Sequence, residues 1–512
     1  MSRPSETASV ALISATARVA GAVALVLLGF RAVSDDDFAR VVIAQRFAAA
    51  PHLDPTGTSW LPLPFWLVGG GMKVFGASLL VARVLAVVSA GVAGAIVAAM
   101  AMAVGLTRRR AIAASLLAAA MPWAMQLAVA TVPEVPAAAG AAAGAMALAS
   151  PSPRLRVLGA LALLASCLSR YDAWPITVLF AVLTLIDASR ARGTDRWLHV
   201  SAALLAVTGP IAWTAWQSVV YHDPFRYLGL VRSYRQALGT GPSLLRRVLG
   251  YPIGAIEDMR EMVGAGVVGV VSLLVVRRRL HASSSAPSND APTLDVRWGR
   301  PLLLAAFQLL VLILGDVRDG APTHHPERAL LGPATLVVFA STDAFGALLA
   351  GERSRARRDS LAAAAMLGLA AYVAFRVYRS LPWFQSAPRP REVAAGRALE
   401  AATTRGDRVL LDTRDLSGGP DYGYYAMLAA FGRPLDAEID RDQDPRKPRL
   451  VSSFSAESSL RDRASAAHAK VLLAWGDEHR FVSESLGARV VAEEPAAATN
   501  ADTPRWYVLA MP

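Results

Sequence analysis

The sequence has little charge and almost no cysteine. Of its 512 residues only 18% are charged and 54% are hydrophobic, whereas soluble chains are nearer a quarter charged. The single cysteine, Cys167, lies inside an apolar run, which excludes an intramolecular disulfide and a cysteine-based metal site. No Walker A loop and no Gly-x-Ser-x-Gly elbow occurs, which argues against an ATP-driven pump and an elbow-type hydrolase. The composition indicates an integral membrane protein.

Long apolar runs are what the sequence has in abundance. A helix that crosses a bilayer needs about 20 mostly apolar residues, and we expect about eleven such spans. They cover residues 10–33, 79–106, 111–130, 135–149, 155–169, 174–186, 198–219, 263–276, 301–314, 329–349 and 361–378. The alternative for the first run is a cleavable signal peptide, but no clear small-residue cleavage site precedes the acidic residues 35–37, and many spans follow.

Arginine clusters between the runs predict the orientation of the chain. The net charge of +12 would suggest nucleic acid in a soluble protein, but most of the arginines lie between apolar runs in alternate connections. Because positive residues stay on the cytoplasmic side, we expect a cytoplasmic N-terminus and no nucleic-acid partner. The clusters are residues 108–110, 154 and 156, 190–196, 277–279 and 353–358. The segment 282–292 is expected to be a flexible cytoplasmic loop.

The tail changes character after residue 380. Residues 408–412 and 470–474 are typical of short buried strands, and residues 394–404 and 460–469 of the helices before them. Alternating helix and strand predicts a small α/β domain. The fold class is therefore mostly α: a polytopic transmembrane helix bundle over residues 1–380, with an extracytoplasmic α/β domain over 381–512.

Polar residues at the outer ends of the spans are the candidate functional residues. Asp35, Asp36 and Asp37 repel one another. One of them can be a general base for an acceptor, or they can hold a divalent cation such as Mg²⁺ or Mn²⁺. The alternative is an N-cap, with Asp35 or Asp36 capping a helix over residues 38–49. The Pro- and Trp-rich stretch that contains Trp60 suggests an interfacial segment, or simple aromatic anchoring.

Two further outer segments carry charge next to apolar runs. Glu134 stands alone in a short loop, where a carboxylate at membrane depth indicates a site, although a helix cap is the alternative. Arg170, followed by Tyr171 and Asp172, breaks the positive-inside pattern, and its guanidinium fork matches phosphate oxygens. An ion pair of Arg170 with Asp172 or Asp36 is an equally good interpretation.

The loop before residue 329 supplies the last candidates. His324 and His325 are adjacent, and such a pair rarely binds one metal ion without further ligands. We therefore favour a phosphate-binding or proton-transfer role for His325 and Arg328, with Glu327 between them in the sequence. Residues 221–259 are expected to form an amphipathic segment on the membrane surface. A pore or transporter would place its charges near the middle of the bilayer, where the sequence has few.

The order of these motifs resembles the GT-C class of polytopic glycosyltransferases, in particular the bacterial aminoarabinose transferases and the protein O-mannosyltransferases. The matching features are an acidic pair after the first span, a Pro/Trp stretch, Val74-Phe75-Gly76, Arg83 at the start of the next span, Glu134, Arg170-Tyr171-Asp172-Ala173-Trp174 and Asp223-Pro224-Phe225. The resemblance covers roughly the first 380 residues. The Lys-Pro-Pro-Leu motif of the aminoarabinose enzymes is absent.

The resemblance implies a glycosyltransferase in the bacterial cytoplasmic membrane. It would move a sugar from a polyprenyl-phosphate or polyprenyl-diphosphate carrier to a lipid, glycan or protein acceptor at the outer face. The implied catalytic residues are Asp36, Asp37 and Glu134, with Asp36 as the base. The implied substrate-binding residues are Asp35, Trp60, Arg83, Arg170, Tyr171, Asp172, His325, Glu327 and Arg328. The alternatives are a flippase or carrier of lipid-linked sugars and an envelope structural protein, neither of which cleaves a bond.

Overall fold

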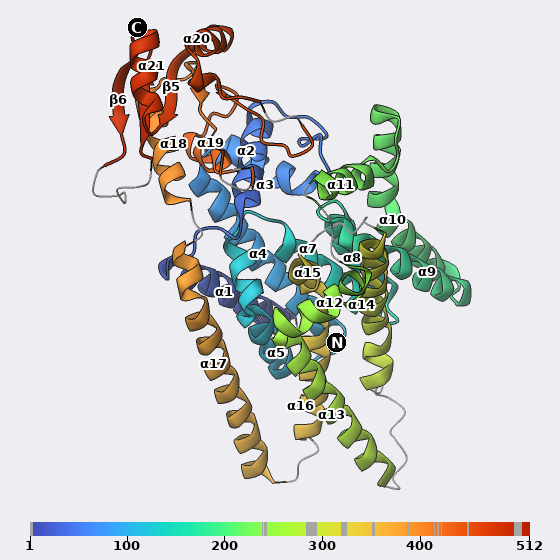
Figure 1. Cartoon of the computed structure of the whole chain (residues 1–512). Helices are drawn as coiled ribbons and strands as arrows, with labels where there is room; N and C mark the ends of the chain where they lie inside the picture. The colour runs from blue at the N-terminus through green and yellow to red at the C-terminus, as the bar shows by residue number, and fades with distance from the viewer. Residues whose placement is uncertain are drawn as a thin grey trace.

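The fold was obtained as a computed structural model. It describes residues 4–237, 239, 243–282, 294–318, 325–350, 354–386, 389–413, 415–416, 419–420, 422–447, 450–495 and 504–512. Within them, helices make up nearly all of the chain up to residue 386, and a small mixed sheet follows (Figure 1).

The first half of the helical part contains the helices that the sequence predicts and two that it does not. Each predicted run in this half lies mainly on one helix, except that 111–130 divides between α5 and α6, while α3 and the one-turn η1 fall outside the runs. The elements are α1 (Pro4–Leu27), α2 (Asp35–Ala49), α3 (Leu63–Phe75), α4 (Leu79–Ala103), α5 (Arg108–Ala120), α6 (Pro122–Val129), α7 (Glu134–Ala147), α8 (Pro153–Cys167), η1 (Tyr171–Ala173), α9 (Trp174–Arg190) and α10 (Gly193–Tyr221).

The second half contains the predicted surface segment and the remaining runs. The segment 221–259 folds into two helices, α11 (Arg226–Ala237) and α12 (Leu244–Glu257). On α12, Leu244, Leu245 and Ile256 are each more than 60% exposed, as expected of a helix on an apolar surface. The other elements are α13 (Arg260–Ala282), α14 (Leu294–Val317), α15 (Pro326–Ala329), α16 (Leu331–Ala350) and α17 (Arg355–Ser386). Most of the predicted loop 282–292 lies outside the described residues.

The helices long and apolar enough to cross a membrane are fewer than the predicted runs. Among the described residues six qualify alone, and two bent pairs bring the number to eight. Pro122 begins α6 after a bend of 70° from α5, and α12 and α13 meet at 81°. The other three predicted runs lie on α17 and on α7 and α8, which have only 14 and 15 residues. The chain is a multi-pass membrane protein, and α7 is a buried interior helix rather than a full span.

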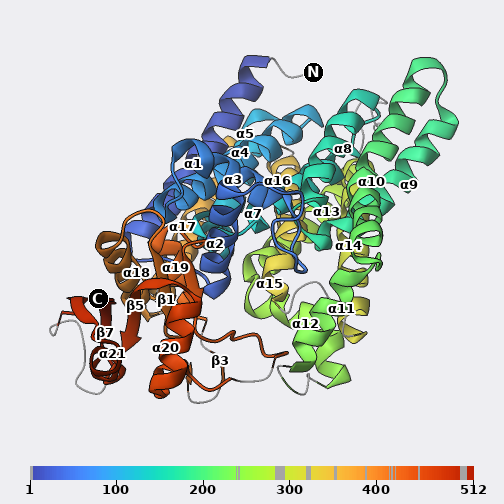
Figure 2. The ribbon, with the colours of Figure 1, turned by 90° about the horizontal axis from the view of Figure 1, so that it is seen from above.

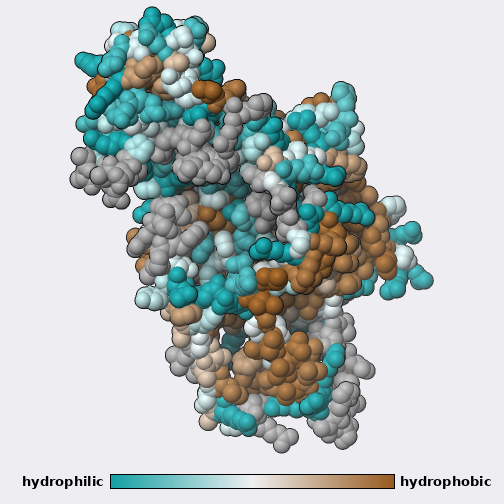
Figure 3. Space-filling view, viewed as in Figure 1, coloured by the Kyte–Doolittle hydropathy of each residue, from teal (hydrophilic) through white to brown (hydrophobic). Residues whose placement is uncertain are grey.

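The surface agrees with a membrane location. Figure 3 shows apolar residues gathered over the helical part, while the C-terminal region is mostly polar. On α13, Val267, Val270 and Val271 are more than half exposed, as are Leu310 and Leu314 on α14. Apolar patches of this kind mark a surface that contacts lipid or another protein.

Ion pairs join the helices at the end of the bundle away from the C-terminal region. Asp343 on α16 is fully buried and contacts Arg110 of α5 and Arg297 of α14, each at 2.8 Å. Asp187 on α9 accepts two hydrogen bonds from Arg300 of α14, at 2.7 and 3.0 Å. Arg110, Arg297 and Arg300 therefore hold α5, α9, α14 and α16 together.

The C-terminal region is the predicted α/β domain. Its five-stranded sheet has the order β4-β1-β5-β7-β6, in which β1 is parallel to β4 and β5, and β7 is antiparallel to β5 and β6. Strands β1 and β5 and helices α18 and α20 confirm the predicted elements. The elements are α18 (Pro390–Ala402), β1 (Arg408–Leu411), α19 (Tyr424–Phe431), β4 (Ala437–Ile439), α20 (Glu457–Ala466), β5 (Ala469–Trp475), α21 (Glu478–Leu486), β6 (Arg489–Glu493) and β7 (Trp506–Ala510), with the pair β2 (Asp415–Leu416) and β3 (Gly419–Pro420) and the one-turn η2 (Ser453–Ser455).

The C-terminal domain packs against α2. Phe38, Val41 and Val42 of α2 share one buried apolar cluster with Met427 and Phe431 of α19. Figures 1 and 2 both show α19 lying next to α2, with α18 on the other side of α19. We call this side of the helical part the domain-bearing face. Since α17 runs through residue 380, the predicted division of the chain at that residue stays a prediction.

Candidate active site

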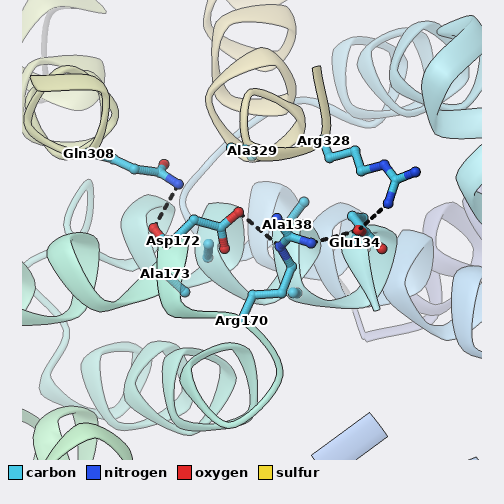
Figure 4. A pocket seen from close by; sticks show the side chains of 11 residues that line it. Glu134, Ala138, Arg170, Asp172, Ala173, Gln308, Arg328 and Ala329 are labelled. Atoms are coloured by element: carbon cyan, nitrogen blue, oxygen red, sulfur yellow. Dashed lines mark hydrogen bonds and ion pairs between the residues drawn. The ribbon is translucent and has the colours of Figure 1, made fainter. Parts of the chain in front are cut away.

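Four chain segments that are distant in sequence meet at the domain-bearing face. They are the first turn of α2, the N-terminus of α7, the segment from residue 170 through η1, and α15. A small pocket of about 10 Å³, close to the room that one water molecule needs, lies between the last three of these segments and α14. Figure 4 shows Glu134, Arg170, Asp172 and Arg328 pointing toward one another around it. Helices α7 and α8 form a hairpin. Glu134 begins the first helix and Arg170 follows the second, so both residues lie at the same end of the hairpin.

Arg170 joins two buried carboxylates. Its Nη1 lies 2.6 Å from Glu134 Oε1 and its Nε donates to Asp172 Oδ2 at 2.9 Å. Burial alone would lower the pKa of Arg170, but Asp172 and Glu134 raise it above its ordinary value. Burial alone would raise the pKa of Glu134, but Arg170, Arg328 and Arg40 together hold it below its ordinary value. Both groups are therefore charged at neutral pH.

Arg328 links this buried pair to the surface. Its Nη1 lies 3.8 Å from Glu134 Oε1 and 3.5 Å from Asp36 Oδ2, and its Nη2 donates to Ser34 Oγ at 3.2 Å. The Arg328 side chain is 5% exposed, whereas that of Asp36 is 46% exposed. Asp36 is thus a solvent-accessible carboxylate beside a buried cation.

Arg40 belongs to the same cluster and was not among the candidates from the sequence. It is a buried residue of α2, and its charge is close enough to Glu134, Asp36, Arg170 and Arg328 to interact with all four. Its guanidinium carbon lies 4.2 Å from the centre of the Trp60 ring. Among the described residues, its Nε has no hydrogen-bond partner. The spacing of four residues from Asp36 on one helix is the signal that could have found it.

Asp37 faces the protein interior. Its side chain accepts a hydrogen bond from the Val33 amide at 2.5 Å, and its backbone carbonyl accepts one from Thr131 at 2.6 Å. Burial raises the pKa of Asp37 to about 7, against the opposing effects of the Val33 amide and Arg328. Its Oδ1 has no hydrogen-bond partner among the described residues. Asp37 is close to the cluster but forms no ion pair with it in the described part of the chain.

The Asp35 side chain contacts the start of the C-terminal region. It forms two hydrogen bonds with Arg389, the residue before α18. The three acidic residues form the first turn of α2, and the N-cap is Ser34. The interpretation of Asp35 or Asp36 as the N-cap is therefore wrong, because the cap is the residue before them.

Among the described residues no group of three or more His, Cys, Asp or Glu side chains is arranged to hold a metal ion. The divalent cation stays a prediction, without a converging ligand set at the triad.

Six predicted substrate-binding residues lie outside the pocket lining, among them Trp60, Tyr171 and Arg83. Trp60 stacks on Phe65 with 6.1 Å between ring centres and covers Arg40. Tyr171 stacks on Tyr227 at 4.1 Å. Arg83 donates to the Arg31 carbonyl oxygen at 3.1 Å. Trp60 therefore reaches the cluster through Arg40, whereas Arg83 forms no ion pair with the cluster in the described part of the chain.

The loop before α16 is partly described. His324 lies outside the described residues. His325 Nδ1 lies 3.1 Å from Glu327 Oε1, and Glu327 is buried. These two residues flank Pro326 at the start of α15, and neither lines the pocket that Arg328 lines.

The cluster is a carboxylate and guanidinium site open to solvent at Asp36. Glu134 Oε2 and Arg328 Nε have no hydrogen-bond partner among the described residues, and buried polar atoms in native proteins are usually satisfied. A phosphate oxygen or a hydroxyl group could satisfy them. The arrangement can bind an anion beside a base, which is what a group transfer from a phosphate leaving group needs.

Sequence comparison with known proteins finds no relative. No family model matches the chain, and no curated protein matches it. The solved structures do include similar folds. ArnT from Cupriavidus metallidurans bound to undecaprenyl phosphate superposes with a TM-score of 0.53 over 96% of this chain and 97% of that chain, at 14% identity. The same protein in the apo state gives a TM-score of 0.42 over 95% and 96%, at 14% identity.

The likeness to the first of these structures extends over nearly the whole of both chains. It includes the helical part and the C-terminal domain, so it is a likeness of the complete architecture rather than of one helix hairpin. The fold expected from the motifs is confirmed. The chain has the fold of ArnT, a polytopic membrane glycosyltransferase of the GT-C class.

Proposed function

We propose that the chain is a membrane glycosyltransferase that takes a sugar from a polyprenyl-phosphate or polyprenyl-diphosphate carrier and transfers it to a lipid, glycan or protein acceptor. The fold supports this proposal because ArnT, which has the same fold, has been solved with undecaprenyl phosphate bound. We place the reaction at the outer face of a bacterial cytoplasmic membrane, with the N-terminus in the cytoplasm and the C-terminal domain outside.

The observation that carries the proposal is the contact between Asp36 and Arg328. A half-exposed carboxylate lies 3.5 Å from a guanidinium group that is 5% exposed. The first group can take a proton from an acceptor hydroxyl, and the second can bind a leaving phosphate. In an inverting displacement the sugar lies between base and phosphate ligand, so in this proposal substrate binding separates the two groups and leaves Asp36 on the acceptor side and Arg328 on the phosphate side of the anomeric carbon.

The reaction is a single displacement at the anomeric carbon. The acceptor oxygen forms a bond to that carbon while its proton passes to Asp36. The bond from the carbon to the phosphate oxygen breaks, and the electron pair leaves with the lipid phosphate. Attack on the face opposite to the phosphate inverts the configuration. The Arg328 guanidinium stabilises the charge that develops on the leaving oxygen.

Arg170 has a different role in this proposal. Both of its short contacts are with carboxylates, Glu134 and Asp172, so its fork is already occupied. Arg170 keeps Glu134 ionised and in place, and Glu134 in turn orients the acceptor or Arg328. The isoprenoid chain of the donor lies against the apolar helices, where it is held by close packing rather than by the hydrophobic effect, since the lipid around it is equally apolar.

Reconstitution of the purified protein in vesicles with a radiolabelled polyprenyl-phosphate sugar tests the function. Appearance of label on an acceptor together with free polyprenyl phosphate supports a transferase. A flippase or carrier moves the intact donor across the bilayer, so labelled donor that changes leaflet without bond cleavage identifies that alternative. An envelope structural protein leaves the donor where it was and uncleaved.

A further inference from the structure

The acidic triad of α2 consists of Asp35, Asp36 and Asp37, and Asp35 is paired with an arginine of the C-terminal region. Arg389 Nε and Nη2 donate to the two oxygens of Asp35 at 2.9 and 2.8 Å, across 354 residues of sequence. Such a fork-to-fork pair fixes direction as well as distance. The two side chains are 24% and 28% exposed, so the pair is only partly screened by water.

The backbone of Arg389 is held in an unusual conformation. Its φ and ψ are 48° and 43°, in the left-handed region that non-glycine residues rarely adopt. Surrounding contacts must offset the cost of such a conformation. Besides Asp35, Arg389 contacts Glu392 in the first turn of α18, with Nη1 3.5 Å from Oε1.

Other contacts attach the C-terminal domain to α2 without Arg389. Gln45, near the other end of α2, donates to the Ala429 carbonyl oxygen of α19 at 2.9 Å and to that of Ala77 at 3.2 Å. The apolar cluster around Phe38 and Phe431 joins the same two helices. Loss of Arg389 should therefore leave the domain attached, and the Asp35–Arg389 pair acts on the first turn of α2 alone.

We propose that Arg389 is a positioning residue for the candidate active site: it fixes the first turn of α2 and neutralises Asp35, so that Asp36 is held toward Arg328. The proposal rests on the proposed function, because it concerns the same carboxylate. It makes the C-terminal domain a part of the catalytic assembly, since the domain supplies the group that orders the acidic triad.

The physical reason is the charge of the triad. With Arg389 present, Asp35 is paired with Arg389 and Asp36 with Arg328, while Asp37 is turned inward to the Val33 amide. Without Arg389, the Asp35 carboxylate is left beside Asp36 and repels it. The first turn of α2 then loses both a fixed side chain and a favourable charge balance, and Asp36 moves away from Arg328.

Hydrogen exchange of backbone amides tests the positioning independently of any sugar transfer. In Arg389→Gln, amides of residues 33–39 should exchange about tenfold faster than in the wild type, as expected for the loss of charged hydrogen bonds. The matched control is Arg391→Gln. Arg391 forms a similar two-bond pair with Glu494, slightly shorter at 2.7 and 2.6 Å, within the C-terminal domain. The control should leave exchange at residues 33–39 unchanged.

Steady-state kinetics tests the consequence for the site. Arg389→Gln should lower kcat about tenfold with a donor KM within about twofold of the wild type, because a displaced base affects the chemical step rather than donor binding. Arg391→Gln should keep the wild-type kcat. The double variant Asp35→Asn/Arg389→Gln should be no slower than the slower of the two single variants, since the two groups act through each other.

The outcomes separate this proposal from the proposed function. Unchanged exchange at residues 33–39 in Arg389→Gln overturns the positioning role, whether or not the protein transfers sugar. Equal loss of kcat in Arg389→Gln and Arg391→Gln also overturns it, because both variants would then act through domain stability. Faster exchange in a protein that never cleaves the donor leaves the positioning of α2 standing and removes the proposed function.

Discussion

Arg328 is the buried cation that connects the two parts of the candidate active site. It lies between the buried Glu134 and the half-exposed Asp36. Its contacts with them are longer than the 2.6 Å between Arg170 and Glu134. Its N–H groups are therefore the ones that a donor phosphate can take over with the least rearrangement.

Arg328→Gln should weaken donor binding. Gln keeps one donor group but loses the charge and the fork, and a charged hydrogen bond contributes about 1.5–3 kcal/mol, so we expect the Kd for polyprenyl phosphate to rise about tenfold or more. Binding of labelled polyprenyl phosphate to vesicles with the protein measures this. Arg461→Gln, which removes an arginine that is 61% exposed on the C-terminal domain, is the control. Equal affinities of Arg328→Gln and the wild type would exclude Arg328 as the phosphate ligand.

Asp37 predicts a pH dependence of stability. Burial raises its pKa to about 7, well above that of an unfolded chain, so the folded state holds a proton that the unfolded state has released. Its contribution to stability is present at low pH and is lost as the pH rises from about 4 to about 7. In Asp37→Asn this loss is absent, so the stability of the variant relative to the wild type should increase across that range.

Thermal unfolding in detergent between pH 4 and pH 8 checks this expectation. Phe38→Leu is a suitable control, because it alters the next residue, also buried, without removing a titrating group. Its difference from the wild type should stay constant with pH. A constant difference for Asp37→Asn as well would show that Asp37 does not carry the raised pKa.

The sequence predicts which charged residues belong to the site, but only one of the pairs that they form. Asp36, Glu134, Arg170 and Arg328 stand out in it because an Ala/Leu/Val background makes each charge conspicuous. An ion pair of Arg170 with Asp172 was one of two predicted roles, and it is present. Contacts between distant segments, such as Asp35 with Arg389, depend on the tertiary fold and carry no local signal. Arg40 is not a candidate from the sequence, because its spacing of four residues from Asp36 points to the site only once the helix is known to be buried.

The helical hairpin of α7 and α8 sets the distance between Glu134 and Arg170. The two helices pack closely because glycines line the contact. A Cβ atom on Gly140 would lie 2.6 Å from the Ala162 carbonyl oxygen, and one on Gly144 would lie 2.3 Å from Leu163 Cγ. Small residues let helix backbones approach in this way in membranes.

Gly140→Ala should separate α7 from α8. The nearest atom is backbone and cannot move aside, so we expect a loss of about 1–3 kcal/mol of stability and a lower kcat as Glu134 shifts from Arg170. Unfolding temperature and turnover measure the two effects. Gly70→Ala on α3 has no atom within 4 Å of the added Cβ and should be neutral or slightly stabilising. If Gly140→Ala behaves like Gly70→Ala, the close packing is not what sets the site.

At the scale of elements, the hydrophobic pattern predicts where the helices and strands lie along the chain better than it predicts where the helices bend. All eleven apolar runs lie on helices, and the predicted strands and helices of the tail are present. The bends between α5 and α6 and between α12 and α13 were not foreseen, because composition alone does not distinguish a straight span from a broken one. α2 begins at Asp35, three residues before the predicted start, since adjacent aspartates are favoured in a first helical turn.

At the scale of the whole molecule, the architecture persists where sequence similarity does not. At 14% identity the chain still follows ArnT over 96% of its length. The apolar content that reveals a membrane protein fixes helix number and packing only loosely, so many sequences suit one bundle. The charged cluster is compatible with fewer sequences than the apolar part of the bundle, since each buried charge needs a partner.

The C-terminal domain and the bundle form a single assembly in this account. Helix α2 contacts both, through the apolar cluster with α19 on one side and through Asp36 and Arg328 on the other. The sequence indicated two regions of different character and placed the change near residue 380. It gave no sign that the second region contacts the acidic triad of the first.

Turnover of a radiolabelled polyprenyl-phosphate sugar by the wild type and by Asp36→Asn, in vesicles at equal protein content, tests the central claim most directly. We predict transfer with release of polyprenyl phosphate by the wild type and a kcat lower by about 100-fold or more in Asp36→Asn, because general base catalysis contributes that much. Glu457→Gln, which alters a carboxylate 57% exposed on the C-terminal domain, should match the wild type. Wild-type turnover by Asp36→Asn would contradict the account.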